Sequence, residues 1–410
     1  MYYWLSICSI AILCSCSQGS ATQDNQGNMD SIFLTDRARE LAHKLILTDG
    51  HIDVPHRLNG LMEDVGNRTV HGDFDYVRAK EGGLNAPFMS IYVPATYQDN
   101  GGAKEFAEKM IALVEEMVNQ HPDKFATAGS PQEVQSLFEQ GKIALPMGME
   151  NGAPLGNDLD NVEYFYQRGI RYITLTHSKD NLICDSSYDS TRTWNGLSDF
   201  GRQVVTEMNR VGIIADVSHV SDSAFYQVME ISKAPAIASH SSCRHFTPGW
   251  ERNMSDDMIK TLASNDGVIQ INFGSSFLDQ ASRESSDQIN GHLTKWESEQ
   301  SGLSRTEIDR YRKDYYRKHF VYSDVSRVAD HIDHVVSITG IDHVGLGSDY
   351  DGVGDTLPTG LKDVSQYPNL IAELLRRGYS EEEIAKICYK NVFRVWNKVA
   401  EVAQELQLAN

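Results

Sequence analysis

The sequence predicts an α/β fold, a (β/α)8 TIM barrel with a helical insertion after the seventh strand. Eight apolar runs of strand length recur along the 410 residues, and longer segments of helical character separate them. Runs that are apolar almost throughout indicate strands buried on both faces, as in a parallel sheet. Strands that alternate with helices indicate parallel βαβ units, and a barrel with insertions reaches this length as one domain. The runs span residues 44–53, 86–94, 143–150, 172–177, 213–219, 236–240, 267–273 and 343–349.

Three connecting segments carry apolar residues at every third or fourth position, which is the spacing of an amphipathic helix. They span residues 103–119, 201–211 and 323–339, and a closing amphipathic helix follows residue 381. A His-x-Asp pattern at residues 331–333 lies in the third segment. Side chains two residues apart diverge on a helix, so we expect a solvated helix face there and no metal site.

Residues 275–322 follow the seventh run and form a long, polar segment that is dense in charge. We expect a helical insertion that lies over the mouth of the barrel or beside it. Three interpretations remain open for this insertion: a solvated excursion, a substrate lid, or a contact between the two copies of a homodimer.

Residues 1–16 are typical of an export signal. Residues 5–13 are largely apolar, and this run is too short to span a bilayer. The run leads into LCSC at residues 13–16, which resembles a bacterial lipobox with Cys16 as the lipidated residue. A plain secretory signal that is cleaved elsewhere remains the alternative.

Residues 17–30 are rich in serine, glutamine, glycine and asparagine, a composition that predicts a flexible tether. This assignment leaves residues 31–405 for the barrel. The expected location is therefore the bacterial cell envelope, where a lipid anchor would hold the barrel at the membrane, facing the periplasm or the outer surface.

Charge and cysteine content exclude some functions. The formal net charge is −20 at pH 7. Nucleic-acid binding requires clustered lysine and arginine, so we expect no nucleic-acid partner. Three of the six cysteines lie in the predicted signal. The others, Cys184, Cys243 and Cys388, show no metal-type pairing, and we expect packed side chains with at least one free thiol.

Side chains that can bind metal follow the ends of the predicted strands. His51 and Asp53 close the first run, and residues two apart in a strand point to the same face, so both can hold one ion. In barrels, the carboxyl ends of the strands carry the active site. The residues that close other runs in the same way are Glu150, His177, His219, His240 and Asp349. The sequence therefore predicts a metal-dependent hydrolase.

Imidazole and carboxylate ligands favour zinc, and a set of this size predicts two Zn²⁺ per chain. His51 and Asp53 would serve one ion, and His219 and His240 the other. Glu150 is the expected bridge, because a buried glutamate without a cation would be costly.

Two ions that share a water lower its pKa and polarise a carbonyl, so the expected nucleophile is a metal-bridging hydroxide. Asp349 is suited to hold this hydroxide and to pass its proton to a leaving amine. Asp351 lies two residues further on and is a rival for the same role.

The sequence resembles the membrane (renal-type) dipeptidase family of the amidohydrolase superfamily. The likeness covers residues from about 45 to 400, which is nearly the whole chain after the predicted signal and tether. The matching stretches are DGHID (49–53), GLNAPF (83–88), GMEN (148–151), LTHS (175–178), DVSH (216–219), ASHSS (238–242), RNMSDD (252–257) and DHVGLGSDYDG (342–352).

The resemblance implies a binuclear zinc site with the same five ligands and with Glu150 as the bridge. It also implies that His177 stabilises the oxyanion, that Arg252 binds the carboxylate of the substrate, and that Asp349 is the family's aspartate at the eighth strand. Residue spacing alone gave no role to Arg252. Arg244 and His245 compete with it for the carboxylate.

The resemblance implies a zinc-dependent dipeptidase that hydrolyses L,L dipeptides. Hydrolysis of L,D dipeptides is a further expectation that remains open. His56 and His71 lie in the first loop, where either could touch the substrate. Two other functions remain open: another binuclear-metal amidohydrolase that acts on N-acyl amino acids or lactams, and a surface lipoprotein that captures peptides without cleaving them.

Overall fold

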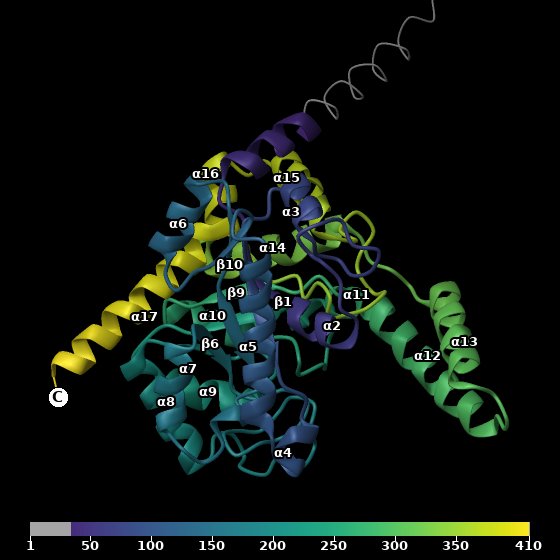
Figure 1. Cartoon of the computed structure of the whole chain (residues 1–410), viewed down its shortest axis with the longest axis horizontal. Coiled ribbons are helices and arrows are strands. Elements are labelled where there is room, and N and C mark those ends of the chain that lie inside the picture. The colour runs from purple at the N-terminus through teal and green to yellow at the C-terminus, as the bar shows by residue number, and fades with distance from the viewer. Residues whose placement is uncertain (1–33, 410) are drawn as a thin grey trace, which may run out of the picture.

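Eight parallel strands form a barrel in the computed structural model, which describes residues 34–409 (Figure 1). The first and last strands meet where the Asp349 N–H donates to the His51 carbonyl (3.0 Å) and the Asp53 N–H donates to the Tyr350 carbonyl (2.9 Å). The predicted fold is therefore confirmed. In spatial order the strands are β1 (Thr48–Ile52), β2 (Ala86–Tyr92), β5 (Met147–Glu150), β6 (Ile170–Thr174), β7 (Ile214–Asp216), β8 (Ile237–Ser241), β9 (Val268–Ile271) and β10 (Val344–Leu346).

Each predicted run overlaps a barrel strand, but the run at residues 143–150 contains two strands. Its first part, β4 (Ile143–Leu145), pairs with β3 (Phe125–Thr127) in a separate two-stranded sheet. Only β5 belongs to the barrel. Pro146 lies between the two and has no N–H to donate to a sheet, which explains the break.

Helices cover the outside of the barrel, and several begin with a serine whose side chain accepts a backbone N–H, as at Ser198, Ser221 and Ser255. Residues 34–44 are also helical. The remaining helices outside the insertion are α2 (Val54–Gly60), α3 (Tyr76–Gly82), α4 (Thr96–Asn100), α5 (Ala103–Gln120), α6 (Pro131–Glu139), α7 (Asp160–Gln167), α8 (Asp199–Val211), α9 (Asp222–Ile231), α10 (Asp256–Ser264), α14 (Val325–Thr339), α15 (Tyr367–Arg376), α16 (Glu381–Ala385) and α17 (Asn391–Leu408).

The insertion after β9 is helical, as predicted. It contains α11 (Ser275–Leu278), α12 (Gln280–Glu299) and α13 (Arg305–His319), and the last two form a hairpin that stands away from the barrel (Figure 1). No residue of α13, all of which the structure describes, is buried. The hairpin has a small apolar cluster of its own, formed by Ile289, Leu293 and Phe320.

The prediction of a solvated helix face at residues 331–333 was wrong for His331. This residue lies on α14 but is fully buried. The Cys243 N–H donates to its Nδ1 (3.0 Å), so its Nε2 donates to the Leu278 carbonyl (3.0 Å). Burial lowers the pKa of His331 to about 3. The side chain is neutral and links the loop after β8 to the start of the insertion.

We expect His331→Ala to lower the free energy of unfolding by about 2–4 kcal/mol, because it leaves a buried N–H and a buried carbonyl unpaired and opens a cavity. Urea denaturation measures this change. His292→Ala removes an exposed histidine of the hairpin and should change the free energy by less than about 1 kcal/mol. An equal effect of the two substitutions would contradict this account of His331.

The three cysteines within the described residues are buried and free, as expected from their spacing. Burial raises the pKa of the Cys388 thiol to about 12 and raises that of Cys184 well above its ordinary value. Within residues 34–409, no helix has the length and apolar character needed to cross a bilayer. The predicted signal, the tether and Cys16 lie outside the described residues.

Candidate active site

The carboxyl ends of the barrel strands bring the predicted site residues together around one cavity of about 510 Å³. His51 lies in β1, Glu150 ends β5 and His240 lies in β8. His51 and His240 are buried almost completely and lie against Glu150. The predicted residues that line the cavity itself are Asp53, Glu150, His177, His219 and Asp349.

Glu150 occupies the centre of this group. Its Oε2 lies 3.4 Å from His51 Nε2, and its Oε1 lies 3.1 Å from His219 Nε2 and 3.3 Å from His240 Nε2. On the far side, Asp53 Oδ2 lies 3.4 Å from His51 Nε2. One carboxylate therefore faces a His51–Asp53 pair with one oxygen and a His219–His240 pair with the other.

Hydrogen bonds fix the ring of His51 with one nitrogen toward Glu150. Tyr172 donates its hydroxyl hydrogen to the Gly50 carbonyl (3.0 Å), so its oxygen accepts from His51 Nδ1 (2.8 Å). His51 Nε2 is then the atom that faces the carboxylates. The Tyr172 ring fits because residue 148 is glycine: a Cβ there would lie 1.9 Å from Cζ of the ring.

A second relay orients His240. Ser239 donates its hydroxyl hydrogen to Asp216 Oδ2 (2.6 Å), and its oxygen lies 2.7 Å from His240 Nδ1. Nδ1–H of His240 therefore donates to Ser239, which leaves the Nε2 lone pair directed at Glu150. Residue spacing did not identify Tyr172, Ser239 or Asp216.

The protonation preferences match a site for cations. Burial lowers the pKa of His240 to about 3 and lowers that of His219 well below its ordinary value, so both imidazoles are neutral. Burial alone would also lower the pKa of His51, but Tyr172, Glu150 and Asp53 outweigh it and raise this pKa well above the ordinary value. Positive charge is thus favoured between the two carboxylates.

Several buried atoms here have no hydrogen-bond partner among the described residues. They include His51 Nε2 and Asp53 Oδ1. His219 Nε2 accepts from Arg252 Nη2 (3.1 Å), so it carries a lone pair and no hydrogen, as His240 Nε2 does, and the two nitrogens lie only 2.8 Å apart. Such an arrangement is unfavourable without a cation. Nitrogen and carboxylate oxygen ligands of this kind fit zinc.

Of the four groups of side chains within residues 34–409 that each place one ligand atom within 4.8 Å of the others, three lie at this site. Glu150 belongs to two of them, and His51 also belongs to two. The groups are His51, Glu150 and His240; Glu150, His177 and His219; and His51, Asp53 and Asp349. The five predicted ligands are therefore neighbours, and His177 and Asp349 stand beside them.

Asp349 faces the same ligands from the last strand. Its Oδ2 accepts from Asn272 (2.8 Å), and burial, together with Asp53 and Glu150, raises its pKa to about 7. Gly352 lies against both aspartates: a Cβ there would be 2.2 Å from Asp53 Oδ2 and 2.3 Å from Asp349 Oδ1. The close approach of these two carboxylates therefore requires glycine at position 352.

Asp351, the rival of Asp349, points to other partners. Its Oδ2 lies 3.0 Å from Arg57 Nε, and its Oδ1 accepts from the Asp73 N–H (2.6 Å). The Asp351 N–H in turn donates to Asp73 Oδ2 (2.9 Å). Asp351 thus holds the loop after β10, and the geometry favours Asp349 for chemistry.

Arg252 lies beside the His219–His240 pair and is only 2% exposed. It donates to Ser241 Oγ (2.7 Å) and to the His240 carbonyl (2.8 Å), while its Nε has no partner among the described residues. Of its competitors, Arg244 is held by two hydrogen bonds to Asp222 (2.7 and 2.6 Å), and His245 is exposed.

Aromatic side chains complete the wall of the cavity. Tyr92 and Tyr188 line it, and neither was predicted as a site residue. Of the two histidines expected in the first loop, His56 lies in α2 and lines the cavity with its ring edge-on to Tyr92 (4.9 Å between centroids). The His71 side chain is 62% exposed and pairs with Glu63.

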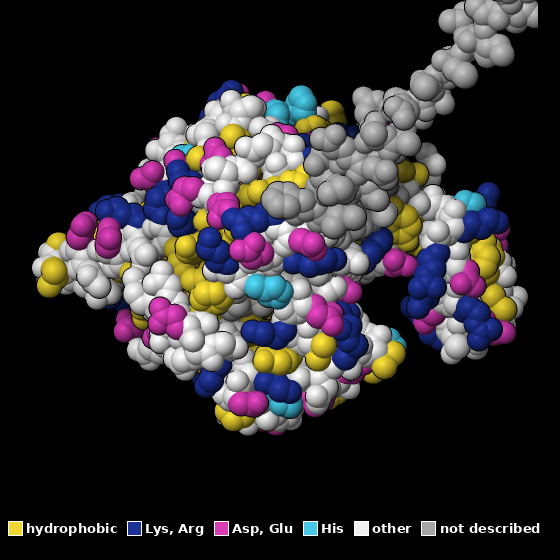
Figure 2. Space-filling model, turned by 90° about the horizontal axis from the view of Figure 1, so that it is seen from above, with side chains coloured by type: hydrophobic (Ala, Val, Ile, Leu, Met, Phe, Trp, Pro, Cys, Tyr) yellow, Lys and Arg dark blue, Asp and Glu magenta, His cyan; other side chains and the backbone are white. Residues whose placement is uncertain are grey.

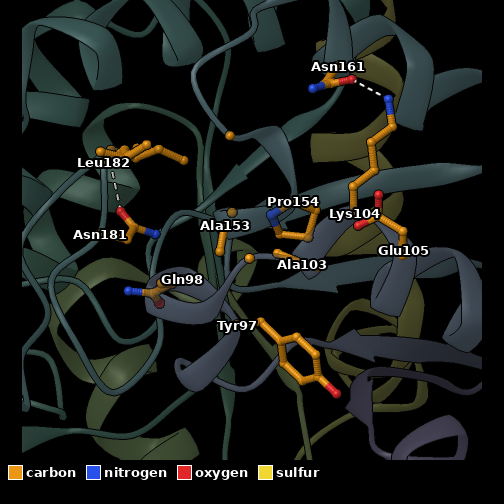
Figure 3. Close-up of a pocket in the computed structure, with 15 residues that line it drawn as sticks. Tyr97, Gln98, Ala103, Lys104, Glu105, Ala153, Pro154, Asn161, Asn181 and Leu182 are labelled. Carbon is orange, nitrogen blue, oxygen red and sulfur yellow. Dashed lines mark hydrogen bonds between the residues drawn. The ribbon is translucent and has the colours of Figure 1, made fainter.

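A second cavity, of about 280 Å³, lies beside α4, α5 and the loops after β5 and β6 (Figure 3). It contains none of the predicted site residues. Its two charged side chains are Lys104 and Glu105, and Lys104 donates to Asn161 (2.6 Å). The cavity offers no group of metal ligands and no activated nucleophile, so we place the chemistry at the barrel mouth.

Comparisons with known proteins identify a family of similar sequences. A family model described as membrane dipeptidase (peptidase family M19) matches residues 35–410. The chain is 34% identical over 368 residues to dipeptidase tcpJ of Claviceps purpurea (strain 20.1), a match that covers 87% of this chain and 77% of the relative.

Two solved structures are similar along almost their whole length. The probable dipeptidase PvdM from Pseudomonas aeruginosa is 29% identical, with a TM-score of 0.77 and coverage of 90% of this chain and 99% of the other. A metallopeptidase from Rhodobacter sphaeroides, bound to a phosphinate mimic of the dipeptide L-Ala-D-Ala, is 26% identical, with a TM-score of 0.71 and coverage of 87% and 99%.

Proposed function

Because the chain belongs to the membrane dipeptidase family, peptidase family M19, we propose that it is a zinc-dependent dipeptidase with two Zn²⁺ per chain. The observation that carries this proposal is the position of Glu150, with one carboxylate oxygen toward each of two ligand pairs. No rearrangement of the barrel is needed to bring the five ligand side chains together.

In this proposal His51 and Asp53 would hold one zinc, His219 and His240 would hold the other, and Glu150 would serve both. When bound, the metal pair would polarise the peptide carbonyl and supply a nucleophilic water at neutral pH. The relays through Tyr172 and Ser239 keep the ligand nitrogens aimed at Glu150, as outer partners of metal-binding histidines commonly do.

The side chains around the metal site would orient a dipeptide. Arg252, beside the His219–His240 pair, binds the free carboxylate of the substrate. His177 lines the cavity with its Nε2 3.7 Å from Glu150, where it can donate to the developing oxyanion. Asp349, on the His51–Asp53 side of the metal site, passes a proton to the leaving amine. We include L,D dipeptides among the substrates, because the Rhodobacter sphaeroides metallopeptidase binds an L-Ala-D-Ala mimic.

The test measures metal content and peptide turnover on the same purified protein. Mass spectrometry of the metals should find about two zinc ions per chain, and a panel of L,L and L,D dipeptides should be hydrolysed. N-acyl amino acids and a lactam serve as comparison substrates. If these are cleaved and dipeptides are left intact, the chain is another amidohydrolase. If nothing is cleaved and the metal content is well below one ion per chain, capture of peptides without cleavage becomes the function to test.

Removal of the Tyr172 hydroxyl should weaken metal binding. Tyr172→Phe keeps the ring but removes the acceptor of His51 Nδ1–H, so we expect a 10- to 100-fold loss of zinc affinity, about the usual effect of losing such a partner. Competition with a fluorescent chelator measures it. Tyr367→Phe removes another buried hydroxyl, one bonded to Asp49, and should leave zinc affinity unchanged. Equal losses in the two variants would argue against the relay.

We also propose that Cys16 carries a lipid that anchors the protein in the cell envelope. The support is the LCSC sequence at residues 13–16, with the apolar run that precedes it. The wild-type protein should be recovered with membranes, and Cys16→Ala should move it to the soluble fraction. A membrane-bound Cys16→Ala variant would refute the anchor.

A further inference from the structure

The α12–α13 hairpin contributes two side chains to the active-site cavity. Ser286 of α12 and Tyr316 of α13 line it together with the metal-site residues. The rest of the hairpin stands apart from the barrel, and Figure 2 shows a hollow between the two. Most of the α12–α13 hairpin is therefore remote from the chemistry, and these two residues are the link between the hairpin and the site.

A second hollow of about 490 Å³ lies between the hairpin and the loop after β10. It is distinct from the cavity of about 280 Å³ beside α4 and α5. It shares four lining residues with the active-site cavity. They are Ser286, Tyr316, Val353 and Thr356. The two spaces therefore meet along one wall, and Tyr316 is the largest side chain in that wall.

Contacts inside the hairpin hold Tyr316 in this position. A hydrogen bond joins its side chain to that of Ser286 on the neighbouring helix. Its ring stacks on Phe320, with 4.8 Å between centroids and 23° between planes. Phe320 is itself buried in the apolar cluster of the hairpin. The ring of Tyr316 is thus braced from two sides.

The wall lies toward one end of the proposed substrate site. Arg252, which would hold the carboxylate, lies beside His219 and His240. Val353 and Thr356 follow Asp349, which lies at the opposite, His51–Asp53 end of the metal site. A peptide with its carboxylate on Arg252 would therefore direct its amino end toward Tyr316.

We propose that Tyr316 determines substrate length: it closes the amino side of the site and restricts the enzyme to dipeptides. This inference rests on the proposed dipeptidase function. Arg252 limits the substrate at its carboxyl end, because it requires a free carboxylate next to the cleaved bond. Without a wall at the other end, a longer peptide could extend into the second hollow and lose its carboxyl-terminal residue. A steric barrier of this kind excludes the wrong substrate without adding affinity for the correct one.

The experiment compares a dipeptide, Ala-Phe, with the tripeptide Gly-Ala-Phe in the wild type and in Tyr316→Ala. Initial release of phenylalanine from each is followed by chromatography. We expect the ratio of kcat/KM for the tripeptide to that for the dipeptide to rise at least about tenfold in Tyr316→Ala. Gly-Ala should appear as the first co-product of the tripeptide.

Two matched variants separate the wall from a general effect on the hairpin. Tyr316→Phe keeps the ring and should keep the wild-type ratio. Tyr311→Ala removes a tyrosine of the same helix that packs on Trp296 and lines neither hollow, and it should also keep the ratio. Dipeptide turnover in each variant reports a folded barrel.

An unchanged ratio in Tyr316→Ala, with dipeptides still hydrolysed, would overturn this inference and leave the dipeptidase function intact. A wild-type enzyme that cleaves tripeptides as well as dipeptides would also overturn it. If the zinc-loaded wild type cleaves no dipeptide, the proposed function itself fails.

Discussion

Glu150→Gln is expected to lower kcat/KM for dipeptides at least about a thousandfold, which corresponds to about 4 kcal/mol of transition-state stabilisation. Glutamine keeps the shape of the side chain but removes the negative charge that faces both ligand pairs. This change weakens the binding of two neighbouring cations most, because the negative charge between them offsets their mutual repulsion. We therefore also expect the zinc content to fall from about two ions per chain to one or fewer.

The control is Glu105→Gln, which neutralises a carboxylate of the second cavity and should leave zinc content and turnover unchanged. Thermal melting shows whether Glu150→Gln still folds. A folded Glu150→Gln protein that retains two zinc ions and more than a tenth of the wild-type kcat/KM would contradict the bridging role.

Asp349→Asn is expected to lower kcat by a factor between about 10² and 10⁴, the usual contribution of a general acid or base. The amide can still accept the hydrogen bond from Asn272, so the loop should keep its conformation. It cannot carry a proton to the leaving amine. Zinc content should stay near the wild-type value, which separates this variant from Glu150→Gln.

Asp351→Asn is the matched comparison, because Asp351 also lines the cavity but binds Arg57 and Asp73. We expect it to reduce stability and to change kcat less than tenfold. Stopped assays with a saturating dipeptide measure kcat in both variants. If Asp351→Asn shows the larger loss of kcat, the roles of the two aspartates must be exchanged.

The barrel could be predicted from the sequence because its signals are local. Apolar runs reveal buried parallel strands, and the polar residue that ends six of the eight runs marks the carboxyl edge of the sheet. In a barrel, the carboxyl ends of all parallel strands lie at the same end. His51, Glu150 and Asp349 could therefore be grouped from their positions in the chain alone. Family resemblance was still needed to assign a role to Arg252, because this residue lies in a loop and ends no strand.

Features that depend on pairs of distant residues could not be predicted in this way. The hydroxyl of Tyr172 reaches His51 only because Gly148 leaves space on the neighbouring strand. The sequence around His331 indicates a solvated helix face, but in the folded chain the loop after β8 covers this residue. Pro146 alone gave a local signal for the division of its run into two strands, since proline interrupts a sheet.

The seam between β1 and β10 has a consequence for the timing of activity during synthesis. Asp49, in the first strand, accepts from the N–H groups of His51 (3.0 Å) and Ser348 (2.9 Å), and the Asp349 N–H donates to His51. A growing chain that ends before residue 344 has neither the strand that closes the barrel nor Asp349. Nascent chains should therefore be inert toward peptides until the eighth barrel strand has left the ribosome.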